Sequence, residues 1–257
     1  MIKLPDDAWV AGVDGCKGGW VVALGQVKGK TKVPFVVSTF QEVLASDPKP
    51  SIVAIDVPIG LPTRSPVGGR KCEPAIRAIL RGRANSVFRV PCRSAIYKGL
   101  DENGCVDKAR YRDAYDDACK NPQDETGFSL QSLYIFNKIA EVDKFLAAKR
   151  THARNIYETH PELAFYCMNG KKPVLIPKKK KPGFEYRRLL LERQDIPLEA
   201  IDHCPTQAKR DDVADALACL VTARCLAKGK ATSFPDKPCK DDTDLLMAIW
   251  ACCSAKG

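Results

Sequence analysis

A chain of 257 residues can form one large domain, or one domain with an insertion, and can bury a sizeable core. Its 41 Lys and Arg residues outnumber its 31 Asp and Glu residues, and the net charge of +10 favours anionic partners such as nucleic acid or phosphorylated metabolites. No apolar stretch reaches the roughly 18–20 residues that cross a bilayer, which excludes a membrane-spanning protein.

Five apolar, β-branched runs predict a sheet. The second and third runs form a hairpin, with Gly29 at its turn. The fourth suits a strand buried on both faces. A helix precedes it, so a right-handed crossover makes this strand parallel to the first. The predicted strands lie at about residues 9–14, 20–26, 32–38, 52–57 and 154–159.

Four helices are predicted from apolar residues at helical spacing. The first follows Ser38 or Thr39, either of which can cap it. A long amphipathic helix covers "LQSLYIFNKIAEVDKFLAAK", another surrounds residues 187–193, and the last begins in "RDDVADALACL". Residues 61–150, which begin with an arginine-rich segment, are expected to form a largely helical insertion. The sequence thus predicts a single α/β domain over residues 1–257.

The twelve cysteines do not form a zinc-binding pattern. No Cys-x-x-Cys pair occurs, and none of the three histidines lies at the spacing of a zinc finger. Cysteines in a long chain whose first residues lack the pattern of a signal peptide are usually reduced. The sequence therefore predicts a cytoplasmic protein with reduced, mostly buried cysteines, and it leaves monomer and homodimer open.

Carboxylates follow the first and the fourth predicted strands. Asp14 and Asp56 each end an apolar run. On parallel strands both lie at the carboxyl edge of the sheet, where open α/β sheets place their sites. A single aspartate there is more often a turn residue, whereas two on neighbouring parallel strands favour a site.

The last helix adds more carboxylates. Asp211 is expected to be its N-cap. Asp212 and Asp215 are three residues apart, so they share one face, and no Lys or Arg follows either at helical spacing. Bringing them together with Asp14 and Asp56 is costly unless cations neutralise them. Hard divalent cations prefer oxygen ligands, so the pattern predicts Mg²⁺ (or Mn²⁺) bound by these aspartates.

The segment "YETHPE" adds a second kind of polar group. In a strand, Glu158 and His160 point the same way, because side chains alternate. The proline after His160 keeps that residue extended. A lone histidine is more often structural, but one that lies two residues from a glutamate at a strand end is an equally good candidate for proton transfer. Glu158 or His160 is therefore expected to relay protons.

Basic residues in three segments are candidates for contacts with nucleic-acid phosphates. They lie in the loop after the first strand, in the arginine-rich segment and in a run of four lysines. A solvated surface loop explains each group equally well when it is taken alone. The candidates are Lys17, Arg64, Arg70, Arg89, Arg93, Lys178 and Lys179.

Five stretches resemble an uncharacterised family of predicted nucleases with a ribonuclease H-like fold. They occur in order across nearly the whole chain: "GVDGCKGGWVVA", "AIDVPIGLP", "SVFRVPCR", "YETHPELAF" and "DDVADALACLVTA". The last is also similar to the final helix of Holliday-junction resolvases. The resemblance implies a mixed sheet of order 3-2-1-4-5, in which the first three strands are antiparallel and the last two run parallel to the first.

The resemblance also implies site residues. Asp14, Asp56 and either Asp212 or Asp215 match the nuclease carboxylates. Asp56 stands where such nucleases generally carry the longer Glu, so Glu158 is the candidate for the missing reach. These residues predict a Mg²⁺-dependent nuclease in which two ions about 3.5–4 Å apart, bridged by Asp14, act on a phosphodiester bond.

Two other functions remain open. A phosphotransferase of the actin-like sugar-kinase type shares the fold, but a second glycine-rich phosphate loop and an adenosine-binding motif are not found in the sequence. A non-catalytic nucleic-acid-binding protein is the second alternative, and it leaves the Asp212–Asp215 pair unexplained.

Overall fold

The computed structural model describes residues 3–120 and 125–253. The chain divides into two compact units. The first unit consists of Met1–Val57, Arg154–Ser233 and Ile249–Gly257, and it contains the predicted sheet. The second unit consists of Pro58–Ala153 and Phe234–Ala248. The predicted insertion therefore lies in the second unit, which also takes up a segment from near the C-terminus.

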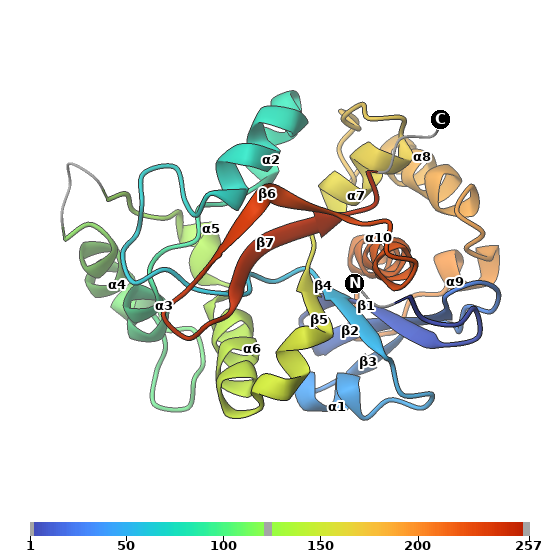
Figure 1. Ribbon diagram of the computed structural model, residues 1–257. Coiled ribbons are helices and arrows are strands. Elements are labelled where there is room, and N and C mark those ends of the chain that lie inside the picture. The colour runs from blue at the N-terminus through green and yellow to red at the C-terminus, as the bar shows by residue number, and fades with distance from the viewer. Residues whose placement is uncertain (1–2, 121–124, 254–257) are drawn as a thin grey trace. The chain divides into compact units, whose positions relative to one another are not determined.

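The sheet of the first unit has the predicted order, β3-β2-β1-β4-β5, so the prediction of an α/β fold with this sheet is confirmed (Figure 1). β1 pairs with β2 in antiparallel and with β4 in parallel orientation, and β4 pairs with β5 in parallel. The strands are β1 (Trp9–Cys16), β2 (Gly19–Gln26), β3 (Phe35–Val37), β4 (Ile52–Ile55) and β5 (Ile156–Glu158).

The hairpin and the crossover helix also follow the sequence. β2 and β3 are antiparallel, and Gly29 in the connection has a φ of 113°, which a side chain would strain. Thr39 is the N-cap of helix α1 (Phe40–Leu44), and its hydroxyl accepts a hydrogen bond from the backbone N–H of Glu42 at 3.4 Å. α1 then buries Phe40 on the sheet.

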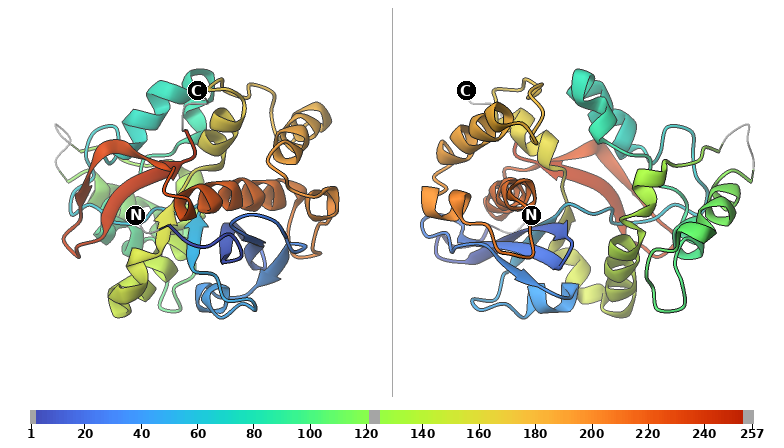
Figure 2. Two further views of the ribbon diagram at one scale, coloured as in Figure 1. Left: turned by 45° about the vertical axis from the view of Figure 1, so that its right-hand side comes forward. Right: turned by 180° about the vertical axis from the view of Figure 1, so that it is seen from behind.

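Helix α10 (Arg210–Ala227) packs directly on β1. A Cβ atom at Gly12 would lie 2.0 Å from the backbone nitrogen of Leu220 and 2.2 Å from the carbonyl oxygen of Ala216, so a larger residue would push the helix off the strand. The left view in Figure 2 shows α10 along its length beside the strands. Its other sides contact α7 (Pro161–Met168), α8 (Lys181–Glu192) and α9 (Leu198–Asp202). Every residue from 213 to 227 is therefore buried.

Several predicted boundaries are wrong. The long amphipathic helix is interrupted at residues 134–135 and forms two helices, and α8 begins before residue 187. The strand pattern after residue 158 is a helix instead, because Pro161 occupies the first turn of α7, where its missing N–H costs nothing. β6 (Thr232–Lys240) and β7 (Leu246–Ala251) form a two-stranded sheet that was not predicted.

The second unit is largely helical, as predicted for the insertion. Its aromatic residues pack closely, with the ring centroids of Phe128 and Phe136 4.8 Å apart. The helices that lie wholly in this unit are α2 (Cys72–Leu80), α3 (Arg93–Lys98), α4 (Tyr111–Ala118), α5 (Leu130–Leu133) and α6 (Phe136–Ala148), with short 3-10 helices at Arg81–Ser86 and Lys108–Arg110.

The prediction of reduced cysteines is wrong for four of the twelve. Disulfides join Cys167 to Cys253 and Cys225 to Cys252, and they fasten the end of the described chain to α7 and α10. Because disulfides persist mainly in oxidising compartments, the cytoplasmic prediction loses the support of the cysteines. In the described part of the chain, no helix has both the length and the apolar character needed to cross a membrane.

Candidate carboxylate site

Asp14 and Asp56 lie side by side at the carboxyl edge of the sheet. Val13 pairs with Ile55 in the parallel register of β1 and β4, and the backbone N–H of Asp56 donates to the carbonyl of Val13 at 3.0 Å. Side chains alternate along a strand, so Asp14 points to the same face as Gly12. That face carries α10. Both aspartates therefore point to the side of the sheet on which the acidic helix lies.

Asp215 completes a cluster of three carboxylates with Asp14 and Asp56, which we call the carboxylate cluster. The contact of Gly12 with Ala216 places the first turns of α10 at the end of β1. Asp215 is 4% exposed. Burial raises the pKa of Asp14 well above its usual value, and the charges of Asp56 and then of Asp215 raise it further. The three side chains are thus close enough to repel one another.

The pKa shifts of the other two members have the same origin. Burial raises the pKa of Asp56 to about 7; Lys178 opposes this shift and Glu162 adds to it. Burial also raises the pKa of Asp215 to about 6; Lys178 opposes this shift, and the charges of Asp56 and Glu162 add to it. Asp215 is buried and Asp14 and Asp56 are half-buried, and when all three are ionised they carry more negative charge than Lys178 neutralises.

Lys178 is the basic partner that the sequence of α10 lacks. Its Nζ bonds to Oδ2 of Asp215, 37 residues away in the chain, and lies 4.0 Å from Oδ2 of Asp211. Burial lowers the pKa of Lys178, but the charges of Asp215 and Asp14 outweigh burial and the pKa is raised. In this structure, the ammonium group of Lys178 is bound to a carboxylate and, contrary to the prediction, is not placed to contact a phosphate.

A buried ion pair supports the loop that carries Lys178. Nη2 of Arg187 bonds to both carboxylate oxygens of Glu162, at 2.8 and 3.0 Å. Nη1 of the same guanidinium donates to the carbonyl of Ile176 at 2.9 Å. Sequence reasoning missed Arg187. In the sequence, Arg187 is one of two adjacent arginines that precede three leucines. An arginine in such a place more often lies at the solvent edge of a helix than in the core, so the sequence does not indicate its burial.

The N-cap prediction for Asp211 is wrong, whereas Asp212 lies in the first turn of α10 as expected and its charge adds to the raised pKa of Asp14. Lys209, not Asp211, is the N-cap of α10. Asp212 is the third residue of the helix, and its Oδ2 accepts a hydrogen bond from the backbone N–H of Lys209 at 2.9 Å. The carboxylates that raise the pKa of Asp215 most are Asp56 and Glu162. The predicted repulsion between Asp212 and Asp215 is therefore not the main electrostatic feature of the site.

Glu158 lies on the other face of the sheet. It pairs with Ile55, so its side chain points opposite to that of Asp56, the next residue in the chain. The idea that Glu158 supplies a longer reach toward the cluster is therefore wrong. His160 is not in a strand: it is the N-cap of α7, and its carbonyl accepts the N–H groups of Leu163 and Ala164 at 3.0 Å.

The basic candidates fall into two groups. In the first unit, Lys17 and Lys179 are exposed. In the second unit, the guanidinium groups are engaged with protein atoms: Arg64 with Glu125 at 2.7 Å, Arg89 with Thr126 at 2.9 Å, Arg70 with Glu73 and the carbonyls of Ile59 and Gly60, and Arg93 with Asp143, Asp241 and Asp242. Arg70 is only 2% exposed, so it cannot reach a phosphate from this position.

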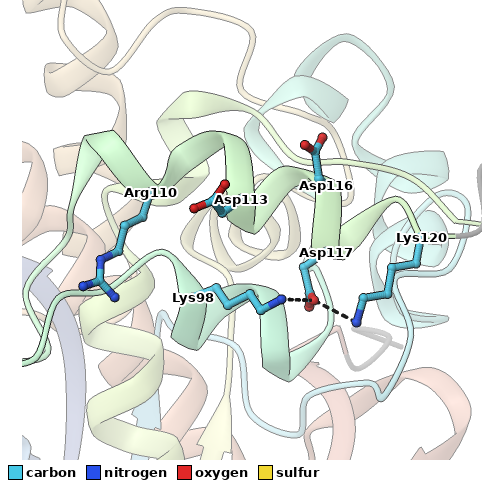
Figure 3. A pocket seen from close by; sticks show the side chains of 6 residues that line it. All are labelled: Lys98, Arg110, Asp113, Asp116, Asp117 and Lys120. Carbon is cyan, nitrogen blue, oxygen red and sulfur yellow. Dashed lines mark hydrogen bonds and ion pairs between the residues drawn. The ribbon is translucent and has the colours of Figure 1, made fainter.

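The second unit has an open pocket of about 540 Å³, shown in Figure 3. Asp117 lies in it between two ammonium groups, with Lys98 at 2.5 Å and Lys120 at 2.8 Å. Burial raises the pKa of Asp117, but hydrogen bonds from Lys120 and Lys98 outweigh it and hold the pKa well below its usual range. Unlike the carboxylate cluster, this aspartate is neutralised by more than one cation.

In residues 3–120 and 125–253, no three His, Cys, Asp or Glu side chains are arranged so that they could hold a metal ion as they stand. The donor set of the carboxylate cluster nevertheless suits a hard divalent cation, because its ligands are carboxylate oxygens. Its excess of negative charge is the property that such an ion would neutralise. The ammonium of Lys178 supplies the positive charge in the observed arrangement.

A family profile described as "Protein of unknown function (DUF429)" matches residues 12–240. The chain belongs to this family. The match includes the carboxylate cluster, Lys178 and the Glu162–Arg187 pair. No curated protein and no solved structure matches the chain.

Proposed function

We propose that this member of the family is a nuclease that uses Mg²⁺ or Mn²⁺ to hydrolyse phosphodiester bonds of nucleic acid. The observation that carries the proposal is the convergence of Asp14, Asp56 and Asp215 from two parallel strands and one helix. The charge of Asp56 raises the pKa of both Asp14 and Asp215, and the charge of Asp215 raises that of Asp14. Buried like charges are costly, and perturbed carboxylates at a strand edge are a signature of functional sites. The sheet order agrees with the one that the nuclease resemblance implies.

The residues of the first unit have distinct roles in this proposal. Asp14, Asp56 and Asp215 would hold the metal, which, when bound, activates water and stabilises negative charge on the phosphate. The close packing of α10 on Gly12 excludes water from one side of the cluster and fixes the position of Asp215. Asp212 fixes the start of α10 through its bond to Lys209.

The surface beside the cluster suits a polyanion. Lys17 follows Asp14 by three residues, at the same edge of the sheet, and is exposed. Lys179 is exposed next to Lys178. Each lysine that contacts a phosphate adds a salt-dependent attraction that does not depend on base sequence. We therefore expect the first unit to bind the backbone of the substrate through these lysines.

The test is cleavage of labelled single-stranded and duplex DNA and RNA, with Mg²⁺, Mn²⁺ or chelator. Wild-type protein should cut only with metal. Asp215→Asn should lose more than about 100-fold in rate, because an amide is a poor ligand for a hard cation and even outer contacts of metal sites are worth 10–100-fold. Asp211→Asn is the matched control, one turn earlier on the same helix, and should keep its activity.

The alternative functions predict other outcomes. Metal-dependent transfer of phosphate from ATP, without strand cleavage, would favour the phosphotransferase. Binding of nucleic acid without cleavage under any metal condition would favour the non-catalytic protein. Equal rates for wild type and Asp215→Asn would remove the carboxylate cluster from the chemistry altogether.

A further inference from the structure

The carboxylate cluster already has a cation. Nζ of Lys178 bonds to Asp215, and the charge of this lysine also lowers the pKa of Asp14 and of Asp56. One ammonium group therefore acts on all three carboxylates. One ammonium group faces three carboxylates, so its single charge cannot balance all three when they are ionised.

The backbone beside Lys178 is held in place. Arg187 bonds to the carbonyl of Ile176 at 2.9 Å, and the N–H of Lys180 donates to the carbonyl of Pro177 at 3.0 Å. A Cβ atom at Gly183 would lie 2.1 Å from that same carbonyl oxygen, so α8 packs tightly against the loop. The side chain of Lys178 is 33% exposed and flexible. Its ammonium group can therefore move away while the loop stays folded.

An ammonium group and a divalent cation compete for the same carboxylate oxygens. Both carry positive charge, and at contact distance they would repel each other strongly in a site of low dielectric constant. A metal ion that binds Asp215 must therefore displace Nζ of Lys178. We propose that Lys178 and the divalent cation are alternative counter-ions of the carboxylate cluster, so that Lys178 sets the metal concentration at which the site loads.

This inference rests on the proposed function, and it adds regulation to the same site. Without metal, the lysine keeps the three carboxylates together in the folded chain. With metal, its ammonium group is released beside the site. The position of Lys178 in the fold then limits activity to conditions in which the divalent cation outcompetes an attached amine.

The first measurement is a calorimetric titration with Mn²⁺ at pH 8, without nucleic acid. Lys178→Met should bind the ion more tightly than wild type by roughly 10- to 100-fold, because the wild type must give up a charge-assisted hydrogen bond when it loads. Lys180→Met is the matched control, since this exposed lysine lies two residues away, and its affinity should equal that of the wild type.

The second measurement uses wild-type protein, and so does not depend on the folding of a variant. Acetylation of lysine amines by an activated ester is followed at each residue by mass spectrometry. Without metal, Lys178 should react slowly, because its Nζ is bonded to Asp215. Saturating Mn²⁺ should increase its rate several-fold, whereas the rate at Lys180 should stay the same.

The outcomes separate the inference from the proposed function. Binding of Mn²⁺ with equal affinity by wild type and Lys178→Met, together with unchanged acetylation of Lys178, would overturn the inference and leave the metal site intact. Absence of Mn²⁺ binding in both proteins would overturn the inference and remove the metal from the proposed function. Competition between Lys178 and Mn²⁺ in a protein that does not cut nucleic acid would support the inference and refute the nuclease.

Discussion

Each unit of the protein contains a group of carboxylates that are wholly or partly buried, and the two groups differ in how their charge is balanced. In the second unit, Arg93 bonds to Asp241 at 2.7 Å, to Asp143 at 3.1 and 3.2 Å, and to Asp242. Backbone N–H groups add further bonds to Asp241, each 2.9 Å long. In the first unit, the carboxylate cluster shares one lysine.

The pKa shifts record this difference. Burial raises the pKa of Asp241, but hydrogen bonds from the backbone of Leu245 and Leu61 outweigh it, so the pKa lies below its usual value. Burial and like charges raise the pKa of Asp14 instead. A buried carboxylate with enough hydrogen-bond donors stabilises the fold, whereas one that is crowded by other carboxylates is stabilised by binding a cation or a proton. The donors around Asp241 thus indicate a structural role, whereas the crowding of Asp14 by other carboxylates makes it a candidate for chemistry.

The largest expected effect is on the stability that Arg93 and its aspartate partners give to the second unit. Arg93→Met should lower the free energy of unfolding by about 3–5 kcal/mol, because it leaves Asp241 and Asp143 buried without their cation. Denaturant unfolding measures the loss, which should be the same with and without Mg²⁺. Arg89→Met is the control: this exposed arginine in the same unit should change stability by less than about 0.5 kcal/mol. If Mg²⁺ restored the stability that Arg93→Met loses, the aspartates of the second unit would also be a metal site, and the difference between the two groups would disappear.

The next effect concerns the two disulfides of the first unit. The disulfides Cys167–Cys253 and Cys225–Cys252 close loops of 86 and 27 residues. Reduction should therefore cost on the order of 2–4 kcal/mol for each bond, mainly by freeing the unfolded chain. Melting with and without a thiol reductant measures this cost.

A thiol count provides the control for that experiment. Unfolded, unreduced protein should show eight reactive thiols, and reduced protein should show twelve. Twelve thiols before reduction would contradict both disulfides. Replacing the exposed Cys105 by Ser should leave the melting temperature nearly unchanged.

The third prediction concerns pH. The pKa of Asp56 is raised to about 7, mainly by burial, whereas an unfolded aspartate titrates near ~3.9. Between these values the folded protein binds more protons than the unfolded chain, so stability falls as the pH rises. The contribution is complete below about pH 4 and lost above about pH 7. The melting temperature of metal-free protein should therefore fall through this interval.

Asp56→Asn isolates the contribution of this residue. The amide does not titrate, so the variant lacks the extra stability that protonation of Asp56 gives at low pH. The melting temperature of the wild type minus that of the variant should therefore be larger at pH 4 than at pH 7.5. Saturating Mg²⁺ should raise the melting temperature of the wild type most at the higher pH, where the carboxylates are ionised. A difference between wild type and variant that stays constant with pH would mean that Asp56 does not titrate in this interval.

The sequence predicted the part of the site that depends on regular geometry. Asp14 and Asp56 could be placed together because both end apolar runs, and the parallel register brings the ends of β1 and β4 to one edge. Asp215 could be added because helical spacing and the neighbouring apolar residues indicate which way it points. These inferences need only the periods of strands and helices.

The rest of the site depends on tertiary contacts. Lys178 is one of four consecutive lysines, and no local pattern shows which of them bonds to Asp215. Glu158 was placed on the wrong face because the pairing of β5 with β4, which decides its direction, has no signal in the sequence. β6 was missed because its two prolines and mostly partly exposed residues do not resemble a buried strand.

The smallest expected effect concerns the surface around the carboxylate cluster. Lys17 and Lys179 are exposed at the carboxyl edge of the sheet and in the Lys178 loop, respectively. If each contacts one phosphate, Lys17→Gln or Lys179→Gln should reduce the slope of log affinity against log salt by about 0.9 on duplex DNA, with a similar loss on every sequence. Lys28→Gln is the matched control, because Gln26 pairs with Trp9, at the opposite end of β1.

Fluorescence anisotropy of a labelled duplex over a range of salt concentrations measures these slopes, and Ca²⁺ in place of Mg²⁺ is a suitable choice to limit cleavage. The free energy of unfolding of each variant should lie within about 0.5 kcal/mol of that of the wild type, since exposed lysines contribute little to stability. Equal slopes for Lys17→Gln, Lys179→Gln and Lys28→Gln would show that the net charge, and not the edge beside the carboxylates, attracts the polyanion. Because the carboxylates themselves repel phosphate, a slope that changes only at the edge positions would place the backbone of the substrate next to the cluster.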